Sequence, residues 1–76
     1  MTQVADITID ARQMEPPEPF VATMDALDIL PKGQTLLLIL DREPHPLYKV
    51  LTKQGFSYQA EFSPEGRFDI YIRHAG

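Results

Sequence analysis

The sequence contains no cysteine among its 76 residues, and this absence excludes several structural supports. Neither a disulfide bond nor a thiolate metal site can stabilise the fold. No thiolate is available as a nucleophile. A cysteine-free chain suits a reducing compartment, and we expect a cytoplasmic protein.

Basic residues are scarce relative to acids, and the formal net charge is −4. Residues 1–32 hold six acids and two bases, a balance of −4, whereas residues 33–76 hold five of each. A nucleic-acid binder normally carries a basic stripe, because phosphate neutralisation supplies most of its affinity. The sequence has no such stripe, so we expect no nucleic-acid partner.

Long apolar runs are missing as well. No segment has the length of a membrane span, and residues 1–20 have no basic region followed by an apolar run. We therefore expect no membrane partner. A chain of 76 residues leaves room for one domain, residues 1–76, with an ordered core from about residue 5 to residue 73.

Signatures of catalysis are also lacking. The sequence has no nucleophile–base motif, no glycine-rich phosphate loop and no HExxH. Paired carboxylates could perform acid–base chemistry, but acids on exposed turns usually titrate normally and so small a domain offers little cavity. An enzyme is therefore the least favoured of three functional classes, and no cofactor is expected.

What the sequence does contain is a regular succession of strand and helix patterns. Alternating or continuous apolar residues predict four strands, at residues 5–10, 35–40, 56–62 and 68–73. Apolar residues at helical spacing predict two helices, from about Phe20 to Pro31 and from Leu47 to Gly55. Proline and glycine in residues 63–66 predict a tight turn between the last two strands.

This order, βαβαββ, predicts an α/β two-layer sandwich with both helices on one face of a four-stranded sheet. A right-handed crossover makes the first two strands parallel neighbours. The opposite face of the sheet is expected to be open.

Two proline-rich segments follow the first two predicted strands. The first proline turn (residues 12–19) ends in Pro16-Pro17-Glu18-Pro19, and the second proline turn (residues 41–46) reads Asp41-Arg42-Glu43-Pro44-His45-Pro46 before Leu47-Tyr48. The first resembles the Cys-Pro-x-Pro motif of the TusA/SirA superfamily, with Pro16 in the place of the cysteine. The second is similar to the Asp-His-Asp-Pro-x-Pro-Leu-Tyr signature of a cysteine-less, uncharacterised branch of that superfamily.

The resemblance spans about Ile7 to Arg73 and implies a mixed sheet in the order 1-2-4-3, with the last strand antiparallel to the others. It also implies a bacterial setting near redox or respiratory metabolism. The chain departs from the branch at Arg42, where histidine is common, and at Phe68, near a position where tryptophan is usual. A sulfur carrier needs a thiol that can hold a persulfide, and proline has none. The chain alone therefore cannot be a sulfurtransferase.

Because the first two strands end at the same edge of the sheet, the proline turns are expected to meet there. This predicts a rim for a ligand or partner, formed by Arg12, Glu15, Pro16, Pro17, Glu18, Pro19, Asp41, Arg42, Glu43 and His45. His45 could titrate or bind a metal in this rim, although one histidine among carboxylates is a weak metal candidate. Alternatively, the acids only complement two helix N-termini and His45 caps the second helix.

The strand at residues 35–40 is apolar on both faces, so some aliphatic side chains must point to the open face. If these are Leu37 and Ile39, they form a patch with Tyr71 that could be an interface. The alternative is that aliphatic residues are good strand formers and that one small patch is tolerated.

The leading hypothesis is a non-catalytic binding or regulatory module. It would contact a protein partner, or a second copy of itself, through the rim, the open sheet face or both. The runner-up is a small-ligand or metal-binding domain that uses His45 with Glu43, Asp41 and Glu15.

Overall fold

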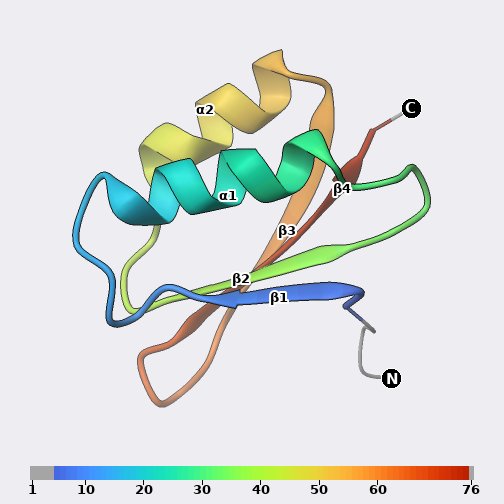
Figure 1. Cartoon of the computed structure of the whole chain (residues 1–76). Helices are drawn as coiled ribbons and strands as arrows, with labels where there is room; N and C mark the ends of the chain where they lie inside the picture. Colours follow the sequence, from blue (N-terminus) through green and yellow to red (C-terminus); the bar gives the residue numbers. More distant parts are fainter. Residues whose placement is uncertain (1–4, 76) are drawn as a thin grey trace.

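The computed structural model describes residues 5–75 and contains every predicted element (Figure 1). The elements are β1 (Ile7–Asp10), α1 (Glu18–Asp28), β2 (Leu36–Leu40), α2 (His45–Lys53), β3 (Phe56–Phe62) and β4 (Phe68–His74). Figure 1 shows both helices on the same side of the sheet. The predicted α/β two-layer sandwich is confirmed.

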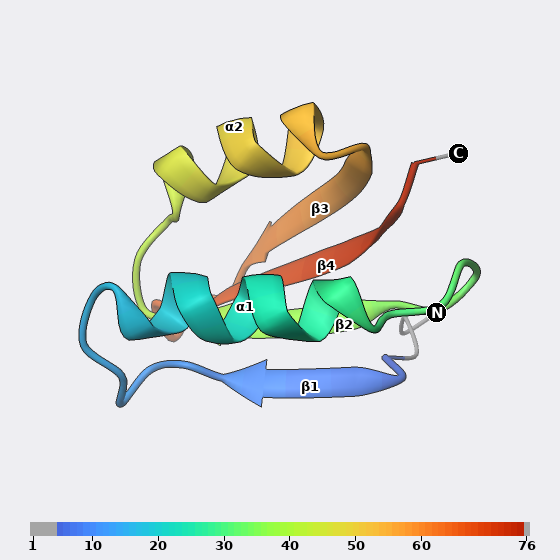
Figure 2. The ribbon, with the colours of Figure 1, turned by 45° about the horizontal axis from the view of Figure 1, so that its top comes forward.

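The four strands form one mixed sheet in the order β1-β2-β4-β3. β1 and β2 are parallel, whereas β4 is antiparallel to both of its neighbours, β2 and β3. The expected order and strand directions are therefore confirmed. α1 packs on β2 and α2 on β3, so each helix covers a different part of the same face (Figure 2).

The core lies between the helices and this face of the sheet. In β2, Leu36 and Leu38 are fully buried, and they lie opposite Ile72 and Ile70 of β4. The helices contribute Leu27 of α1 and, from α2, Leu47 and Leu51 to this core. The continuous aliphatic run of β2 leaves its core face undecided in the sequence, and the structure buries Leu36 and Leu38 on the side of the helices.

Helix α1 begins at Glu18, within the first proline turn and two residues before the predicted start. Pro17 precedes it as the N-cap and Pro19 occupies its first turn, where a residue without an N–H loses no intrahelical bond. The peptide bond between Pro16 and Pro17 is cis. Thr23 is fully buried, and its hydroxyl donates a hydrogen bond of 2.7 Å to the carbonyl oxygen of Pro19.

The predicted turn at residues 63–66 closes the β3–β4 hairpin. The N–H of Gly66 donates to the carbonyl of Ser63 at 2.9 Å, and the φ of Gly66 is +87°, in the left-handed region that favours glycine. β4 continues one residue further than predicted, to His74. The Nε2 of His74 lies 2.7 Å from the carbonyl oxygen of Leu30, which ties the last strand to the end of α1.

Candidate functional site

The two proline turns lie at the same end of the molecule, as the parallel arrangement of β1 and β2 requires. Figure 1 shows the chain leaving both strands at this end and turning upwards into the two helices. The N–H of Ala11 donates to the carbonyl of Ile39 at 2.9 Å, which extends the β1–β2 pairing into the first proline turn. The N-termini of α1 and α2 consequently flank the end of β2.

Between the two turns is a hollow of about 280 Å³, which we call the proline groove. Its floor is formed by Leu38 and Leu40 of β2 and by Leu47 of α2. Its remaining lining comes from the two turns and the start of α1, namely Pro16, Pro17, Pro19, Phe20, Arg42, Glu43, Pro44 and Pro46. Most of these residues are apolar, so the centre of the predicted rim is an apolar groove.

A second hollow, of about 220 Å³, lies beside the proline groove on the side of β1. It shares Pro16, Pro19, Leu40 and Arg42 with the groove and adds Ala11, Arg12, Met14, Glu15 and Asp41. The structure therefore brings most of the predicted rim residues together, in two adjoining hollows. Two rim residues, Glu18 and His45, line neither hollow.

His45 lies outside the groove, in a chain of polar contacts at the start of α2. Its Nε2 is 3.2 Å from Oε1 of Glu43, and the hydroxyl of Tyr48 donates to Oε2 of Glu43 at 3.1 Å. Burial, and then this hydrogen bond, raise the pKa of Tyr48 above its ordinary value. The Tyr48 ring also stacks on Tyr58 of β3, with 4.3 Å between centroids. Glu43 is thus held in place from two sides.

The alternative reading of the rim, in which its acids complement the two helix N-termini and His45 caps the second helix, is supported only in part. His45 is the first residue of α2, whose N-cap is Pro44, and no side chain caps either helix. Glu18 lies in the first turn of α1, where an acid suits the helix dipole, but the first turn of α2 has no acid. His45 is therefore not a cap.

The geometry does not support the metal-binding form of the runner-up hypothesis. Within residues 5–75, no three histidine or acidic side chains come close enough together to hold a metal ion. Asp41 lies 3.8 Å from the guanidinium of Arg42, its neighbour in sequence, and both side chains are largely exposed.

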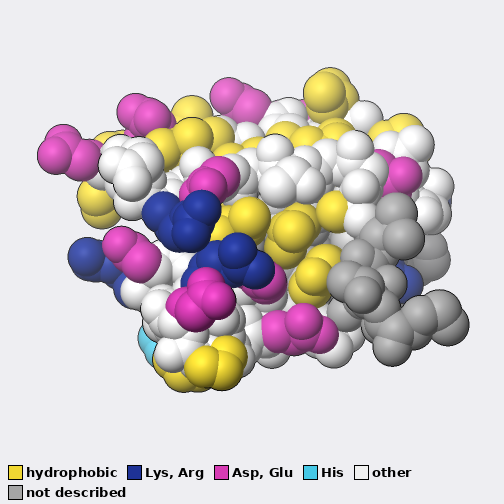
Figure 3. Space-filling model, turned by 90° about the horizontal axis from the view of Figure 1, so that it is seen from below, with side chains coloured by type: hydrophobic (Ala, Val, Ile, Leu, Met, Phe, Trp, Pro, Cys, Tyr) yellow, Lys and Arg dark blue, Asp and Glu magenta, His cyan; other side chains and the backbone are white. Residues whose placement is uncertain are grey.

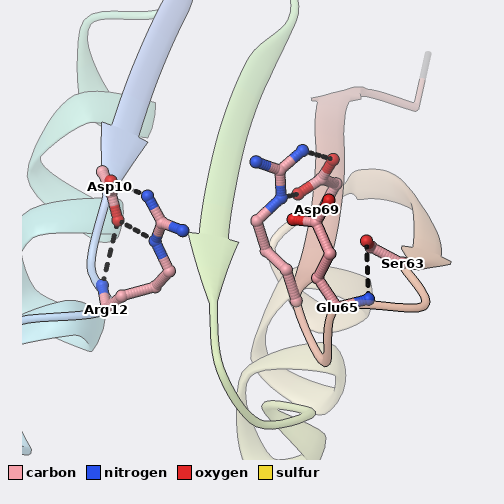
Figure 4. A network of polar contacts seen from close by, with 6 residues as sticks. Asp10, Arg12, Ser63, Glu65 and Asp69 are labelled. Carbon is pink, nitrogen blue, oxygen red and sulfur yellow. Dashed lines mark hydrogen bonds and ion pairs between the residues drawn. The ribbon is translucent and has the colours of Figure 1, made fainter.

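Arg12 turns away from the groove towards the open face of the sheet. Its Nε and a terminal nitrogen donate to the two carboxylate oxygens of Asp10 at 2.9 and 2.6 Å (Figure 4). These hydrogen bonds from the Arg12 side chain, with one from its backbone N–H, lower the pKa of Asp10 from 3.8 to about 2. Arg12 is thus already paired.

The open face carries a second arginine–carboxylate pair. Arg67 binds Asp69 with two contacts, of 2.8 and 3.0 Å, and the Asp69 side chain is only 14% exposed. Figure 4 shows Asp10 and Asp69 on opposite sides of β2. The register places Ile39 between them, opposite Asp10 on one side and Asp69 on the other.

The predicted patch of Leu37, Ile39 and Tyr71, which we call the open-face patch, is assembled on this face. Leu37 lies directly opposite Tyr71. However, Leu37 and Ile39 are half-buried and Tyr71 is only 7% exposed, so the patch offers little free surface. Figure 3 shows this face from below, with hydrophobic side chains beside the charged groups. That the patch forms an interface stays a prediction.

The apolar lining of the groove was the main feature that sequence reasoning missed. Phe20 and Leu47 were assigned to helix faces, and Leu38 and Leu40 to a central strand, without being connected to the proline turns. One available signal was that Pro44 and Pro46 add apolar rings to a turn that faces another proline turn. The Arg67–Asp69 pair was also missed, although alternate positions at a strand's start share a sheet face.

Fold and site together define a class of protein: a two-layer α/β domain with an apolar groove between two proline turns and no thiol beside it. A crystal structure of the SirA-like protein from Desulfitobacterium hafniense has a similar fold, with a TM-score of 0.75. The similarity covers 87% of this chain and 93% of that chain at 23% sequence identity.

A family model of uncharacterized conserved proteins, DUF2249, matches residues 8–74, and the chain belongs to this family. A search of curated proteins finds no match. Within the described part of the chain, no helix is both long and apolar enough to cross a membrane.

Proposed function

We propose that this protein is a non-catalytic binding module whose proline groove receives an apolar side chain from an extended segment of a partner protein. The observation that carries the proposal is the groove itself, a hollow of about 280 Å³ with an apolar floor and proline walls. Phe20, at its wall, leaves 41% of its surface exposed. An apolar group that entered the groove would cover this surface and be removed from water.

Proline walls favour binding because they are rigid before the partner arrives. A proline ring has almost no side-chain conformational freedom to lose on burial. The five prolines that line the groove therefore add contact area at little entropic cost. A volume of about 280 Å³ is slightly below the usual range for small-molecule pockets, which begins at roughly 300 Å³. This size suits one side chain of a docked segment better than a whole buried ligand.

The charges around the groove indicate the character of the partner. The rim has four acids, Glu15, Glu18, Asp41 and Glu43, against the arginines Arg12 and Arg42. Arg12 is engaged by Asp10, Arg42 lies against Asp41 and Glu43 binds His45. Glu15 and Glu18, which form no ion pair with a described residue, leave an acidic balance for a partner. Complementary charge steers association and fixes orientation. We therefore expect the partner segment to carry lysine or arginine beside its apolar residue.

The non-catalytic part of the proposal rests on the residues present. The chain has no cysteine, and Pro16 stands where the resemblance to sulfur carriers places the thiol. Glu15, Asp41 and Glu43 are exposed to solvent, whereas a carboxyl that acts as a general acid usually lies in an apolar pocket. We accordingly assign the chain to a cysteine-less branch of the TusA/SirA superfamily that keeps the scaffold and has lost the sulfur-carrying group.

The cellular setting that we propose rests on that resemblance alone. It is the cytoplasm of a bacterium, in redox or respiratory metabolism. The open-face patch remains a second candidate contact surface in this proposal. It ranks below the groove because Tyr71, at its centre, is almost fully buried.

Site-specific photocrosslinking in the native cell tests the proposal. A photoreactive phenylalanine analogue replaces Phe20 at the groove wall or, as a matched control, Ile29 at the C-cap of the same helix, which is 75% exposed and lines no part of the groove. We expect a discrete protein adduct from position 20 only. The crosslinked segment should be extended and should combine an apolar residue with a basic one. Equal labelling from both positions, or none from position 20, would contradict the proposal.

A further inference from the structure

The strand β3 forms one edge of the sheet and pairs only with β4 within the described part of the chain. Hydrogen bonds at its two ends fix which residues point outwards. Ser63 donates to Arg67 at 2.8 Å, and Ala75 donates to Gly55 at 2.9 Å. Because hydrogen-bonded pairs alternate along an antiparallel ladder, the odd-numbered residues of β3 bond to β4. The backbone N–H and C=O groups of the even-numbered residues therefore point away from the sheet.

This edge has few of the features that normally protect a strand from pairing with another chain. β3 is seven residues long, has neither proline nor lysine, and carries Glu61 as its one charged residue. Two of its aromatic residues are exposed, Phe62 at 63% and Tyr58 at 39%. The opposite edge of the sheet differs, because β1 has only four residues and ends at the ion-paired Asp10.

We propose that β3 pairs with β3 of a second copy of this chain, antiparallel and about a two-fold axis at Gln59. In this register Phe56 lies opposite the second copy's Phe62, and Tyr58 lies opposite its Ala60. Each of these pairs consists of two residues whose N–H and C=O groups point outwards, so the whole strand is used. The two sheets become one eight-stranded sheet with all four helices on the same face.

Two features of the sequence make the strand complementary to itself rather than to any extended peptide. The first is aromatic. Phe62 already packs on Phe68, and Phe56 already packs on His74, each with 4.8 Å between ring centroids. The two-fold register places Phe62 beside the second copy's Phe56. A continuous row of four rings then crosses the interface and covers the exposed Phe62 surface.

The second feature is charge complementarity on the open face. Glu61 lies opposite Asp69, a like charge that Arg67 already neutralises, and Arg73 makes no ion pair with a described residue. In the dimer Glu61 lies opposite the second copy's Ser57, whose neighbour on β4 is Arg73. Two strand spacings, about 10 Å between backbones, separate this glutamate and arginine. With only serine between them, the two long side chains can meet, and this happens twice per dimer.

This inference goes beyond the proposed function, since it concerns the purified chain alone and no residue of the groove. Sedimentation equilibrium from about 1 μM to 1 mM tests it, with circular dichroism to verify folding. We expect a reversible monomer–dimer equilibrium. Ala60→Pro removes one outward-pointing donor and leaves the β3–β4 ladder intact, so it should abolish dimerisation in this range. Ala60→Thr, which keeps the donor, is its control.

Charge reversal tests the register and does not depend on whether the proline variant folds. Glu61→Arg and Arg73→Glu should each raise the dimer dissociation constant at least about tenfold, and the double variant should return it to within about threefold of the original value. Lys32→Glu, the same charge change in an exposed turn far from β3 in sequence, should have no such effect. A strict monomer at 1 mM overturns the proposal. A dimer that none of these variants weakens, or one that the double variant does not restore, overturns it equally.

Discussion

The proline groove and the open face of the sheet are both apolar at their centres, but they differ in how much of their surface is exposed. On the open face, two arginine–carboxylate pairs flank Ile39, and Tyr71 is buried. At the groove, Arg12 turns away to bind Asp10, and Glu43 and His45 bind one another. The floor is buried, but Phe20 and the proline rings of Pro16, Pro17 and Pro46 are exposed there. A surface rich in apolar residues is therefore not necessarily a binding surface, because neighbouring polar side chains determine whether those residues are covered.

The largest expected effect is on the free energy of unfolding, and it should differ between a residue of the groove floor and one of the open-face patch. Leu38 is 1% exposed and belongs to the core, whereas its neighbour Leu37 is half-buried on the opposite face. Leu38→Ala should lower the free energy of unfolding by about 2–5 kcal/mol, as is usual for a fully buried leucine. Leu37→Ala should cost less than half as much. Urea denaturation measures both, and equal losses would show that the two faces of β2 are buried alike.

The next-largest expected effect is a difference in unfolding free energy between variants that break the two ion pairs of the open face. Arg67→Ala leaves the nearly buried Asp69 without its partner and should cost about 1–3 kcal/mol of unfolding free energy. Arg12→Ala breaks a pair whose side chains are both more than 40% exposed, so it should cost about 0–1 kcal/mol. Thermal or urea unfolding of the two variants decides the order. If Arg12→Ala proved the more damaging, our account of how this face is covered would be wrong.

Truncation at the wall of the groove should affect stability little. Phe20 is 41% exposed, so Phe20→Ser should lower the free energy of unfolding by about 1 kcal/mol or less. Val21→Ser, at the next position of the same helix and 50% exposed, is the matched control and should behave similarly. A loss of several kcal/mol at Phe20, measured by urea denaturation, would mean that this ring serves the core rather than a partner.

The smallest effect concerns Asp10 at low pH. Because Arg12 lowers the pKa of Asp10 from 3.8 to about 2, the folded state favours the ionised carboxylate. The associated stabilisation is fully present above about pH 4 and is lost as the pH falls through about 2. A carboxyl NMR titration should find the Asp10 midpoint near the lower value. In Arg12→Ala the midpoint should return towards 3.8, and an unchanged midpoint would show that another group causes the shift.

Most of the fold could be predicted from the sequence because its signals are local. Alternating residues in β4 and the continuous aliphatic run of β2 are enough to predict the two strands, whereas the run of β2 does not show which of its faces is buried. The crossover rule makes β1 one neighbour of β2, but its other neighbour, β4, was predicted from the resemblance and not from periodicity. Glu18 and His74 lie one or two positions outside the predicted ends of α1 and β4, and His74 belongs to β4 because it pairs with Phe56 of β3.

The candidate site was predicted less completely. Parallel strands that end together are enough to bring the proline turns into one neighbourhood. They do not show which side chains turn inwards, and neither the rotation of Arg12 onto Asp10 nor the contact of His45 with Glu43 has a sequence signature. The groove needs three elements at once, the end of β2, the start of α1 and the start of α2. For this reason sequence reasoning described a charged rim and missed its apolar centre.

The most direct test of the binding-module account is the affinity of the partner segment identified by crosslinking, measured by calorimetry against three forms of the chain. The account predicts that Phe20→Ser weakens binding at least about tenfold, a loss of about 1.4 kcal/mol, while Val21→Ser binds as the unaltered chain does. If both serine variants bound the segment with unchanged affinity, the proline groove would not be the binding site.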